Sequence, residues 1–479
     1  MCAAPKAAKE AGGAASGAGP RVIVLGGGPG GYVAALRAAQ LGAVVTLVEK
    51  DLVGGTCLNR GCIPTKALLA SADALARARS GEAYGFSVSG EIAPDFGAMM
   101  ARKERVVTQI RDSVEVLLKK AGVTVVRGSG RLVEGPAVLV ETGEETIVYE
   151  ADKIIIATGS EPAALPMFDF DQPAVLTSTS ALELPETPDS LLIVGAGAIG
   201  CEFASFFAEL GTQVTMVEMM PQMLPQEDAR LAKQFQGVYR KRGIQVMVNT
   251  KVDEITEYAA DHVVAKLSDG SEVTAEKVLV SVGRSPNTSG IGLEEVGVEL
   301  DERGYVRADE QLRTSVADIY AIGDVNGGML LAHVASHEGV VAAENCCGVE
   351  RQRDLRFVPS CTYSHPEVAS VGMTADEASA QGHEVATGTY RFPALGKAVA
   401  LGEDVGYVQL VSDKKTDALL GASMMGPHVT DLIHEVALSL QNGLTVRELG
   451  GTIHAHPTLA EAVMEAAHDV HGESVHVAR

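Results

Sequence analysis

Two stretches of the chain share one pattern of hydrophobic and polar positions. In each, an apolar run of strand type meets a tight glycine turn, a helix-like segment follows, and a second apolar run ends in an acid. The first stretch covers residues 21–50 (RVIVLGGGPGGYVAALRAAQLGAVVTLVEK), and the second covers residues 190–218 (SLLIVGAGAIGCEFASFFAELGTQVTMVE). This order predicts a strand, a helix and a parallel strand, twice over.

Six positions correspond between the two stretches at a constant separation of 169 residues. They are Gly26, Gly28, Gly31, Ala35, Gly42 and Glu49 in the first stretch, and Gly195, Gly197, Gly200, Ala204, Gly211 and Glu218 in the second. In this motif the glycines allow a tight turn, close approach of a pyrophosphate and close helix–strand packing, while the acid accepts hydrogen bonds from ribose hydroxyls. We expect two dinucleotide sites; the alternative is a doubly wound sheet without a ligand.

The second site is expected to prefer NAD to NADP. Glu218 would repel a 2'-phosphate, and the following MMPQMLPQ contains no arginine or lysine to receive one. The alternative is that an arginine from a distant part of the chain folds into the site.

Length and charge narrow the class of protein further. A chain of 479 residues predicts three or more domains. With 62 acidic and 39 basic residues, the net charge of -23 argues against nucleic-acid binding and favours solubility or a basic protein partner. No apolar run approaches the roughly 18 residues that span a bilayer, and we expect a cytoplasmic location. The Ala- and Gly-rich residues 1–20 are expected to form a flexible leader.

The most informative cysteines are Cys57 and Cys62, in GGTCLNRGCIPTK (residues 54–66). In a straight helix, residues five apart lie about 7.5 Å apart along the axis, beyond comfortable disulfide reach, so the backbone must bend if the two bond. Gly61 permits that bend, and Pro64 suits the first turn of a helix. We therefore expect the thiols at a helix N-terminus.

Three roles are open to this pair. The helix dipole and the nearby Arg60 would favour a thiolate and hence redox exchange. A metal clamp would need two further ligands, which no second C-x-x-C or histidine pair supplies, and no metal site is expected. A structural staple would close a very small loop and stabilise little.

Cys346 and Cys347 are adjacent, and we expect them to be buried free thiols rather than a site for a thiophilic metal.

From about residue 21 onward, the ordered motifs resemble the pyridine nucleotide-disulfide oxidoreductases. The motifs are GGTCLNRGCIPTK, the two glycine fingerprints, IIIATGSEP (154–162), VGRSPN (282–287), IYAIGD (319–324) and HAHPTLAE (454–461). The resemblance implies a homodimeric flavoenzyme that oxidises protein-bound dihydrolipoamide to lipoamide through the Cys57–Cys62 disulfide and FAD, and reduces NAD to NADH. Its implied partners are the lipoyl-bearing proteins of 2-oxo acid dehydrogenase complexes or of a glycine cleavage system.

The resemblance also implies the residues that hold each cofactor. For FAD they are Gly26, Gly28, Gly31, Glu49, Lys50, Gly55, Thr56, Lys66, Gly130, Thr158, Gly159, Ser160, Asp324, Leu330, Leu331, Ala332 and His333. For NAD they are Gly195, Gly197, Ile199, Gly200, Glu202, Glu218, Val252 and Gly283. Lys66 is expected beside the flavin, with Glu202 as its acidic partner, because a buried lysine is costly unless it is paired.

The expected base is His456, with Glu461 five residues beyond it. A carboxylate on one ring nitrogen fixes the tautomer and raises the basicity of the other. By the resemblance, His456 reaches in from the second subunit and deprotonates the substrate, whose thiolate attacks Cys57, while Cys62 passes electrons to the flavin. His454 is the alternative histidine.

The fold class expected is α/β, with two Rossmann-like dinucleotide-binding domains and a C-terminal α+β dimerisation domain. The expected segments are a leader at 1–20, an FAD domain at 21–152, an NAD domain at 153–283, a central domain completing the FAD site at 284–354, and an interface domain at 355–479.

Two other functions remain open. A related NAD(P)H-dependent disulfide or mercuric reductase would share the fold, although the chain ends in HGESVHVAR without a cysteine pair. A non-catalytic flavoprotein scaffold or regulator would not need Cys57, Cys62, His456 and Glu461 together.

Overall fold

The computed structural model describes residues 19–143, 145–259 and 261–477, and its chain divides into two compact units. Unit 1 contains the chain up to Ala67, Met100–Ala163 and Gly283–Asp354, and unit 2 contains Leu68–Met99, Ala164–Val282 and the chain from Leu355. The expected leader falls almost entirely outside the described residues. Among the described residues, no helix is both long and apolar enough to cross a membrane.

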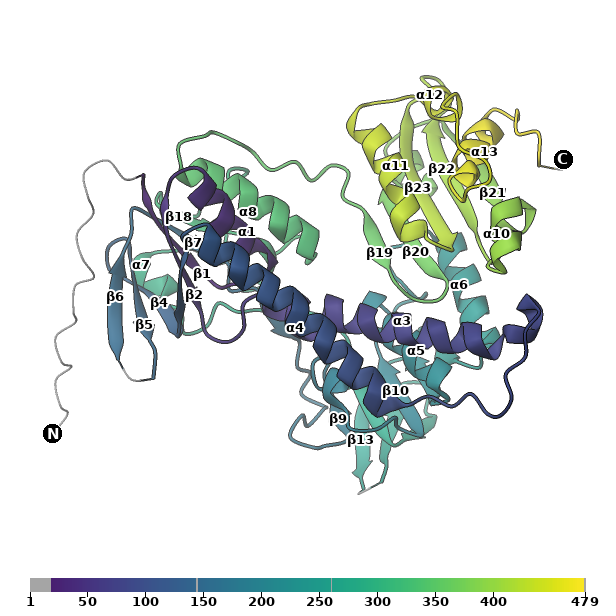
Figure 1. Ribbon diagram of the computed structural model, residues 1–479, viewed down its shortest axis with the longest axis horizontal. Coiled ribbons are helices and arrows are strands. Elements are labelled where there is room, and N and C mark those ends of the chain that lie inside the picture. Colours follow the sequence, from purple (N-terminus) through teal and green to yellow (C-terminus); the bar gives the residue numbers. More distant parts are fainter. Residues whose placement is uncertain (1–18, 144, 260, 478–479) are drawn as a thin grey trace. The chain divides into compact units, whose positions relative to one another are not determined.

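Unit 1 is built on a parallel five-stranded sheet in the order β18-β7-β1-β2-β3 (Figure 1). The strands are β1 (Arg21–Leu25), β2 (Val44–Glu49), β3 (Thr124–Arg127), β7 (Lys153–Ile156) and β18 (Ile319–Ala321). Side chains alternate between the faces of β1. Val22 and Val24 pack into one hydrophobic cluster, while Ile23 and Leu25 pack into another. Burial on both faces explains why these strands are almost uninterrupted apolar runs.

Helices α1 (Pro29–Gln40) and α8 (Ala332–Cys346) lie side by side on one face of this sheet (Figure 1). Glycine makes their close approach possible: a Cβ at Gly339 would lie 2.5 Å from the carbonyl oxygen of Gly30. The helix that follows the IYAIGD segment is therefore held directly against the helix that follows the first glycine turn.

The other elements of unit 1 complete its layers. The second face of the sheet shares a hydrophobic cluster with residues of β4, β5 and α7. The remaining elements are α2 (Gly55–Arg60), β4 (Ser129–Val133), β5 (Ala137–Glu141), β6 (Thr146–Glu150), β8 (Ser160–Pro162), β17 (Arg284–Pro286), α7 (Leu293–Val296) and η3 (Gly323–Asn326). Two long helices, α3 (Cys62–Arg79) and α4 (Phe96–Lys120), each contribute residues to both units.

Unit 2 contains a second parallel sheet, in the order β12-β11-β10-β16-β9. Its elements are β9 (Val175–Leu176), η2 (Ser180–Glu183), β10 (Ser190–Val194), α5 (Ala198–Leu210), β11 (Gln213–Val217), α6 (Ala229–Lys241), β12 (Gln245–Met247) and β16 (Lys277–Val280). The antiparallel strands β13 (Val252–Tyr258), β14 (Val263–Leu267) and β15 (Glu272–Ala275) pack against Leu192 and Val194 of this sheet. The repeated strand–helix–strand pattern therefore forms two similar sheets.

The C-terminal part of unit 2 is an antiparallel sheet in the order β19-β20-β23-β22-β21. Alternate residues of its strands share a hydrophobic cluster with α11 and α13, which explains the mixed α+β character of this part. The elements are β19 (Ser360–Thr362), β20 (Glu367–Gly372), α9 (Ala375–Ala380), β21 (Val385–Arg391), η4 (Phe392–Ala394), α10 (Gly396–Leu401), β22 (Tyr407–Asp413), β23 (Leu419–Gly426), α11 (Val429–Gln441), α12 (Val446–Gly450) and α13 (Glu461–Val470), with η1 (Gly81–Tyr84) from the earlier segment.

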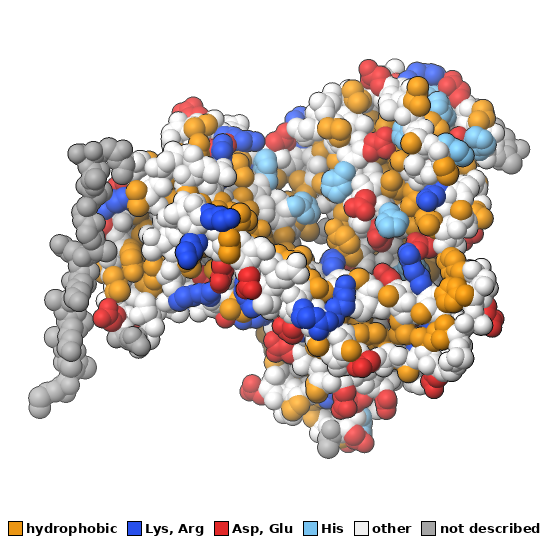
Figure 2. All heavy atoms as spheres, viewed as in Figure 1, with side chains coloured by type: hydrophobic (Ala, Val, Ile, Leu, Met, Phe, Trp, Pro, Cys, Tyr) orange, Lys and Arg blue, Asp and Glu red, His pale blue; other side chains and the backbone are white. Residues whose placement is uncertain are grey.

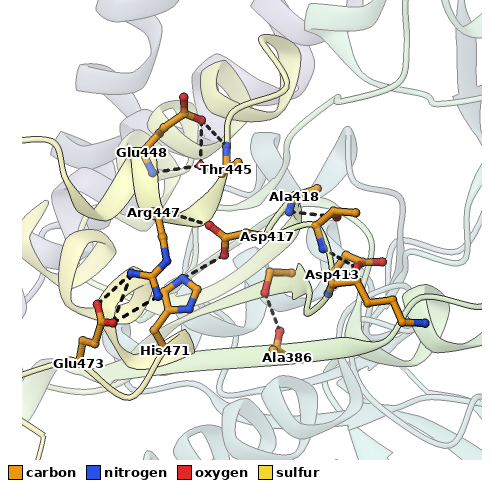
Figure 3. A network of polar contacts seen from close by, with 12 residues as sticks. Ala386, Asp413, Asp417, Ala418, Thr445, Arg447, Glu448, His471 and Glu473 are labelled. Atoms are coloured by element: carbon orange, nitrogen blue, oxygen red, sulfur yellow. Dashed lines mark hydrogen bonds and ion pairs between the residues drawn. The ribbon is translucent and has the colours of Figure 1, made fainter.

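A polar network closes the β22–β23 turn (Figure 3). Asp413 accepts hydrogen bonds from the backbone N–H groups of Lys415 and Thr416, at 2.9 and 3.1 Å. Asp417 lies 3.0 Å both from the backbone nitrogen of Arg447 and from Nε2 of His471. The turn is thus tied to α12 and to the chain that follows α13.

The α/β class predicted from the sequence is confirmed, but the boundary expected between residues 152 and 153 is displaced. The apolar run of β7 pairs in parallel with β1 and β18, so it is a central strand of the first sheet rather than the start of the second domain. Unit 1 consequently continues to Ala163, whereas Leu68–Met99 belongs to unit 2. The other boundaries stay predictions.

Candidate active site

The first glycine turn leaves no room for side chains. Gly26 has φ +107°, and a Cβ there would lie 2.3 Å from the carbonyl oxygen of Ala157. A Cβ at Gly31 would lie 1.9 Å from the carbonyl oxygen of Gly26. Gly28 is the N-cap of α1, and the first turn of that helix carries no acidic residue. The helix therefore presents free backbone N–H groups to an approaching anion, which fits a dinucleotide pyrophosphate.

The second turn has the same geometry. Gly195 has φ +100°, and a Cβ at Gly200 would lie 2.1 Å from the carbonyl oxygen of Gly195. Gly197 is the N-cap of α5, and a Cβ there would meet no atom within 4 Å. No acidic residue occupies the first turn of α5. This turn also fits a pyrophosphate.

The acids that end β2 and follow β11 are held in matching positions. Glu49 accepts hydrogen bonds from the backbone nitrogens of Gly27 and Asp51, at 2.7 and 2.8 Å. Glu218 accepts equivalent bonds from Ala196 and Met220, also at 2.7 and 2.8 Å. Burial raises the pKa of Glu49, although the Gly27 hydrogen bond acts to lower it. Each carboxylate thus lies beside its own glycine turn, where a ribose would follow the pyrophosphate.

The remaining residues expected at the NAD site differ in their surroundings. Ile199 is 36% exposed on α5. The side chain of Val252 is instead packed in the core, where it shares a cluster with Val194. Gly283, at φ +132°, is the residue at which the chain passes from unit 2 to unit 1. Glu202 is 5% exposed and accepts a 3.0 Å hydrogen bond from the backbone nitrogen of Tyr363.

Cys57 and Cys62 lie on two separate helices. Cys57 is in α2, which ends at Gly61 (φ -148°, ψ -109°), and Cys62 is the first residue of α3. The backbone therefore bends at the glycine between them. The two residues are in the reduced thiol form in this structure, and their side chains are hydrogen-bonded to each other. The geometry is that of a paired dithiol.

The electrostatics of the pair differ from the sequence expectation. The hydrogen bond to Cys62 and burial raise the pKa of the Cys57 thiol, while the charge of Lys66 acts to lower it. Arg60, which we expected to favour the thiolate, is instead paired with Asp51. The positive charge of Arg60 also acts to lower the pKa of Glu49. The expectation for Arg60 is therefore wrong, because its guanidinium pairs with Asp51, two residues after β2 ends. The basic residue whose charge acts to lower the pKa of Cys57 is Lys66.

A cavity of about 190 Å³ lies beside Cys57, and most of its lining is apolar. With Cys57, the residues that line it include Tyr32, Leu58, Ile63, Ile110 and Val114. Burial and the nearby Cys57 raise the pKa of Tyr32, which keeps its phenol protonated. Ala332 and His333, from the start of α8, also line the cavity.

Asp324 is held by two partners. Ser160 donates its hydroxyl to the Asp324 carboxylate, and Arg284 lies 3.5 Å from that carboxylate. Arg284 also donates to the hydroxyl of Ser160, at 2.6 Å, and to its carbonyl oxygen, at 2.7 Å. Sequence reasoning missed the role of Arg284. Arg284 belongs to the VGRSPN motif, but the motif does not say which residues it contacts. Only the pairing of β17 with β8 brings Arg284 to Ser160.

Asn287 was missed for the same reason. Its side-chain nitrogen donates to the carbonyl oxygen of Thr158 at 3.0 Å, and the hydroxyl of Thr158 donates to the carbonyl oxygen of Asn287 at 2.8 Å. Its backbone nitrogen donates to the carbonyl oxygen of Gly159 at 2.9 Å. The ATG segment is thus fixed from both sides.

Other residues expected around FAD are all placed in unit 1. A Cβ at Gly55 would lie 2.6 Å from Cα of Gly28, so the start of α2 packs on the glycine turn. A Cβ at Gly130 would lie 2.6 Å from Cδ1 of Leu25. Lys50 and Thr56 are exposed. Leu330, Leu331, Ala332 and His333 form the entry to α8.

Most histidines occur in the C-terminal part of unit 2, and Figure 2 shows several of them on its surface. His456 lies 2.8 Å from Glu461 through Nδ1, and its side chain is 79% exposed. His454 is only 5% exposed and bonds both Glu435 and the carbonyl oxygen of Thr452. Only His456 of these two presents a ring nitrogen to solvent while a carboxylate holds the other.

Glu461 is itself fixed by its neighbours. Its second oxygen accepts a 2.8 Å hydrogen bond from the backbone nitrogen of Thr458. Burial acts to raise the pKa of Glu461, but the bonds from Thr458 and His456 outweigh it and lower the pKa. The carboxylate therefore stays ionised at neutral pH, where it can stabilise a protonated ring.

Comparison with known proteins agrees with this geometry. Residues 20–339 match the family described as pyridine nucleotide-disulphide oxidoreductase, and residues 358–467 match its dimerisation domain. The chain is 45% identical over 470 residues to dihydrolipoyl dehydrogenase of Bacillus subtilis, covering 95% of this chain and 98% of that protein. It is 44% identical to the dihydrolipoyl dehydrogenase of Chlamydia muridarum, covering 93% and 95%.

Solved structures share the fold over nearly the whole chain. The crystal structure of LpdA from Mycobacterium tuberculosis superposes with a TM-score of 0.88 at 30% identity, covering 94% of this chain and 99% of that one. The HOCl-induced flavoprotein disulfide reductase RclA from Escherichia coli superposes with a TM-score of 0.84 at 28% identity, covering 93% and 99%. The chain therefore belongs to the pyridine nucleotide-disulphide oxidoreductase family, as the ordered motifs suggested.

Proposed function

We propose that this protein is a flavin-containing dihydrolipoyl dehydrogenase, an NAD-dependent oxidoreductase that oxidises protein-bound dihydrolipoamide to lipoamide. The observation that carries this proposal is the Cys57–Cys62 dithiol beside an apolar cavity, in the same unit as the first dinucleotide turn. An apolar lining suits the hydrocarbon chain of a lipoyl group better than a charged peptide such as glutathione. The relatives named dihydrolipoyl dehydrogenase support the same substrate.

In this proposal FAD occupies the first turn and NAD the second. FAD and NAD, when bound, supply the two-electron chemistry that restores the disulfide and carries the hydride away. Glu49 and Glu218 hold ribose hydroxyls, and the α1 and α5 N-termini hold the pyrophosphates. Ser160, Thr158, Gly159 and Asp324 contact the flavin side, with Lys66 beside it.

NAD is preferred to NADP at the second turn. The Glu218 carboxylate is fixed and 6% exposed, and a 2'-phosphate there would meet its charge. The side chains that follow are the exposed Met219 and Met220. The first basic residue after them is Arg230.

The thiol chemistry proceeds from the oxidised pair. A substrate thiol gives its proton to the base, and the resulting thiolate attacks Sγ of Cys57. The Cys57–Cys62 bond breaks, and Cys62 leaves as a thiolate. The second substrate thiol attacks the substrate sulfur of the mixed disulfide, and its proton passes to the departing Cys57 sulfur. The substrate ring disulfide closes, Cys57 is released, and two electrons have passed to the cysteine pair.

His456 is the base in this scheme, and the site is completed by a second copy of the chain. The match of residues 358–467 to a dimerisation domain supports a homodimer, in which His456 of the partner subunit takes the substrate proton. Glu461 fixes the ring tautomer so that Nε2 is free to accept it. The partner proteins are those that bear lipoyl groups, in 2-oxo acid dehydrogenase complexes or a glycine cleavage system. The cytoplasmic location expected from the sequence stays a prediction.

Steady-state turnover of the purified holoenzyme tests the proposal. We expect dihydrolipoamide to reduce NAD rapidly and NADP at least about a hundredfold less well, since a misplaced phosphate meets an uncompensated carboxylate. Glutathione disulfide with NADPH should give no comparable turnover. A flavoprotein that ignores dihydrolipoamide but reduces another disulfide would retain the fold and overturn the substrate.

A further inference from the structure

One buried carboxylate on α8 joins three separate segments of unit 1. Glu338 is 1% exposed. Its Oε2 accepts hydrogen bonds from the backbone nitrogen of Gly323, at 2.7 Å, and from the side-chain nitrogen of Asn326, at 3.1 Å. Its Oε1 accepts a hydrogen bond from Nη1 of Arg353, at 2.8 Å. The same side chain therefore holds both ends of η3 and the stretch of chain just before unit 1 ends at Asp354.

The turn that Glu338 holds is the one that carries Asp324. Gly323 has φ +69°, a conformation that glycine adopts at little cost. Asn326 donates a second bond to the carbonyl oxygen of Ala321, at 3.1 Å. Glu338 thus holds the turn that carries Asp324 at both of its ends, while Ser160 and Arg284 hold the Asp324 carboxylate itself.

Arg353 offsets the free-energy cost of burying the Glu338 carboxylate. An ionised carboxylate without a cation loses hydration and gains nothing in return, whereas a charge-assisted hydrogen bond compensates it. The side chain of Arg353 is 22% exposed and that of Glu338 is 2% exposed, so the carboxylate end of the pair is shielded from solvent. The backbone nitrogen of Arg353 is also held, by the carbonyl oxygen of Glu310 at 2.9 Å.

A second ion pair nearby provides an internal comparison. Arg351, two residues earlier, lies 2.8 Å from Oε2 of Glu344, which is also on α8. Glu344 is likewise buried, and its other oxygen is bound by Arg37. Two arginines from one stretch of chain therefore pair with two buried carboxylates of one helix. Only the Arg353 pair ends on the turn that carries Asp324.

We propose that Glu338 is a positioning residue of the flavin site, and that Arg353 fixes its orientation without touching the flavin. This inference rests on the proposed binding of FAD at the first glycine turn and at Asp324. With Arg353 gone, the Glu338 carboxylate loses its cationic partner and can turn toward water. The hydrogen bonds that it accepts from Gly323 and Asn326 then weaken, and the turn that carries Asp324 is held less firmly.

FAD affinity of the full-length protein tests this inference. The apoprotein is reconstituted with FAD and the dissociation constant is read from flavin fluorescence, with the melting temperature of each apoprotein measured in parallel. We expect Arg353→Met to weaken FAD binding about tenfold, in line with the loss of support from a hydrogen bond to a charged group. Arg351→Met, the matched control, should change FAD affinity by less than about twofold, and Arg353→Lys should recover most of it.

A merely structural role would lower both melting temperatures and leave the FAD affinities of the two methionine variants alike. Equal FAD affinities for Arg353→Met and Arg351→Met would overturn the inference. If Arg353→Met does not fold, Arg353→Gln against Arg353→Lys makes the same comparison, and equal affinities there would also overturn it. A wild-type protein that binds no FAD would instead reject the proposed function, and this inference with it.

Discussion

The His456 ring and the Glu461 carboxylate lie 2.8 Å apart, with 79% of the histidine side chain exposed and the carboxylate largely covered. The covered carboxylate fixes the ring through Nδ1 and leaves Nε2 directed to solvent. This is the arrangement of a base that must collect a proton from a substrate brought to it.

Replacing His456 tests its role as the base. We expect His456→Gln to lower kcat with dihydrolipoamide by about 10²- to 10⁴-fold, the usual contribution of general-base catalysis. Glu461→Gln should cost less, about tenfold, because the ring remains but its tautomer is no longer fixed. His434→Gln, at an exposed histidine of α11, is the control and should be near wild type. Equal activities for His456→Gln and His434→Gln would remove His456 from the mechanism.

The space at the first glycine turn can be tested by adding one carbon. Gly31→Ala places a Cβ 1.9 Å from the carbonyl oxygen of Gly26, so α1 must separate from β1. We expect a loss of about 1–3 kcal/mol in the free energy of unfolding and a large loss of bound flavin. The control is Gly237→Ala in α6, where a Cβ would meet nothing within 4 Å. That variant should gain about 0.5–1 kcal/mol, because alanine favours a helix more than glycine does.

Nucleotide preference should depend on Glu218. Removing the carboxylate in Glu218→Ala takes away both the ribose acceptor and the repulsion of a 2'-phosphate. We expect KM for NAD to rise about tenfold or more, and the ratio of kcat/KM for NAD over NADP to fall. Adding an arginine in the double variant with Met219→Arg should improve NADP further, since Met219 is exposed at the edge of the site. An unchanged NAD to NADP ratio in both variants would contradict the assignment.

The turn network of Figure 3 predicts a dependence of stability on acid. Hydrogen bonds from His383, and from the backbone nitrogens of Lys415 and Thr416, lower the pKa of Asp413 to about 2. A carboxyl with a depressed folded-state pKa contributes stability above its unfolded value, and that contribution is lost as the pH falls through the folded value. The melting temperature of the wild type should therefore fall further between pH 5 and pH 2.5 than the melting temperature of Asp413→Asn.

The control for that measurement is Asp404→Asn, at an exposed carboxylate before β22. Its acid dependence should follow the wild type. Parallel curves for the wild type and Asp413→Asn would show that this network does not stabilise the turn.

The sequence predicted the parts of the fold that local patterns specify. The two strand–helix–strand repeats could be found because positions 26 and 195 need a residue that adopts positive φ and leaves no side chain in the turn. The bend at Gly61 followed from its place between the two cysteines. The role of Arg60 was predicted wrongly, because its partner Asp51 is chosen by the direction of a side chain at a helix end. That direction is not encoded in the spacing of the motif.

Contacts between distant segments were beyond the reach of sequence patterns. Arg284 reaches Ser160 only because β17 pairs with β8, and Glu338 reaches Gly323 only because α8 folds back on the turn before it. The boundary near residue 153 was misplaced for a similar reason: an apolar strand does not reveal which of two similar sheets it joins.

The most direct test of the central claim follows the cysteines through one half-reaction. Oxidised holoenzyme is mixed anaerobically with one equivalent of dihydrolipoamide in the absence of NAD, quenched with an alkylating reagent, and mapped by mass spectrometry. We expect Cys57 and Cys62 to change from a disulfide to alkylated thiols, while Cys201 and Cys346 do not change. If Cys57 and Cys62 stay joined and the dihydrolipoamide is not consumed, the proposed chemistry is wrong.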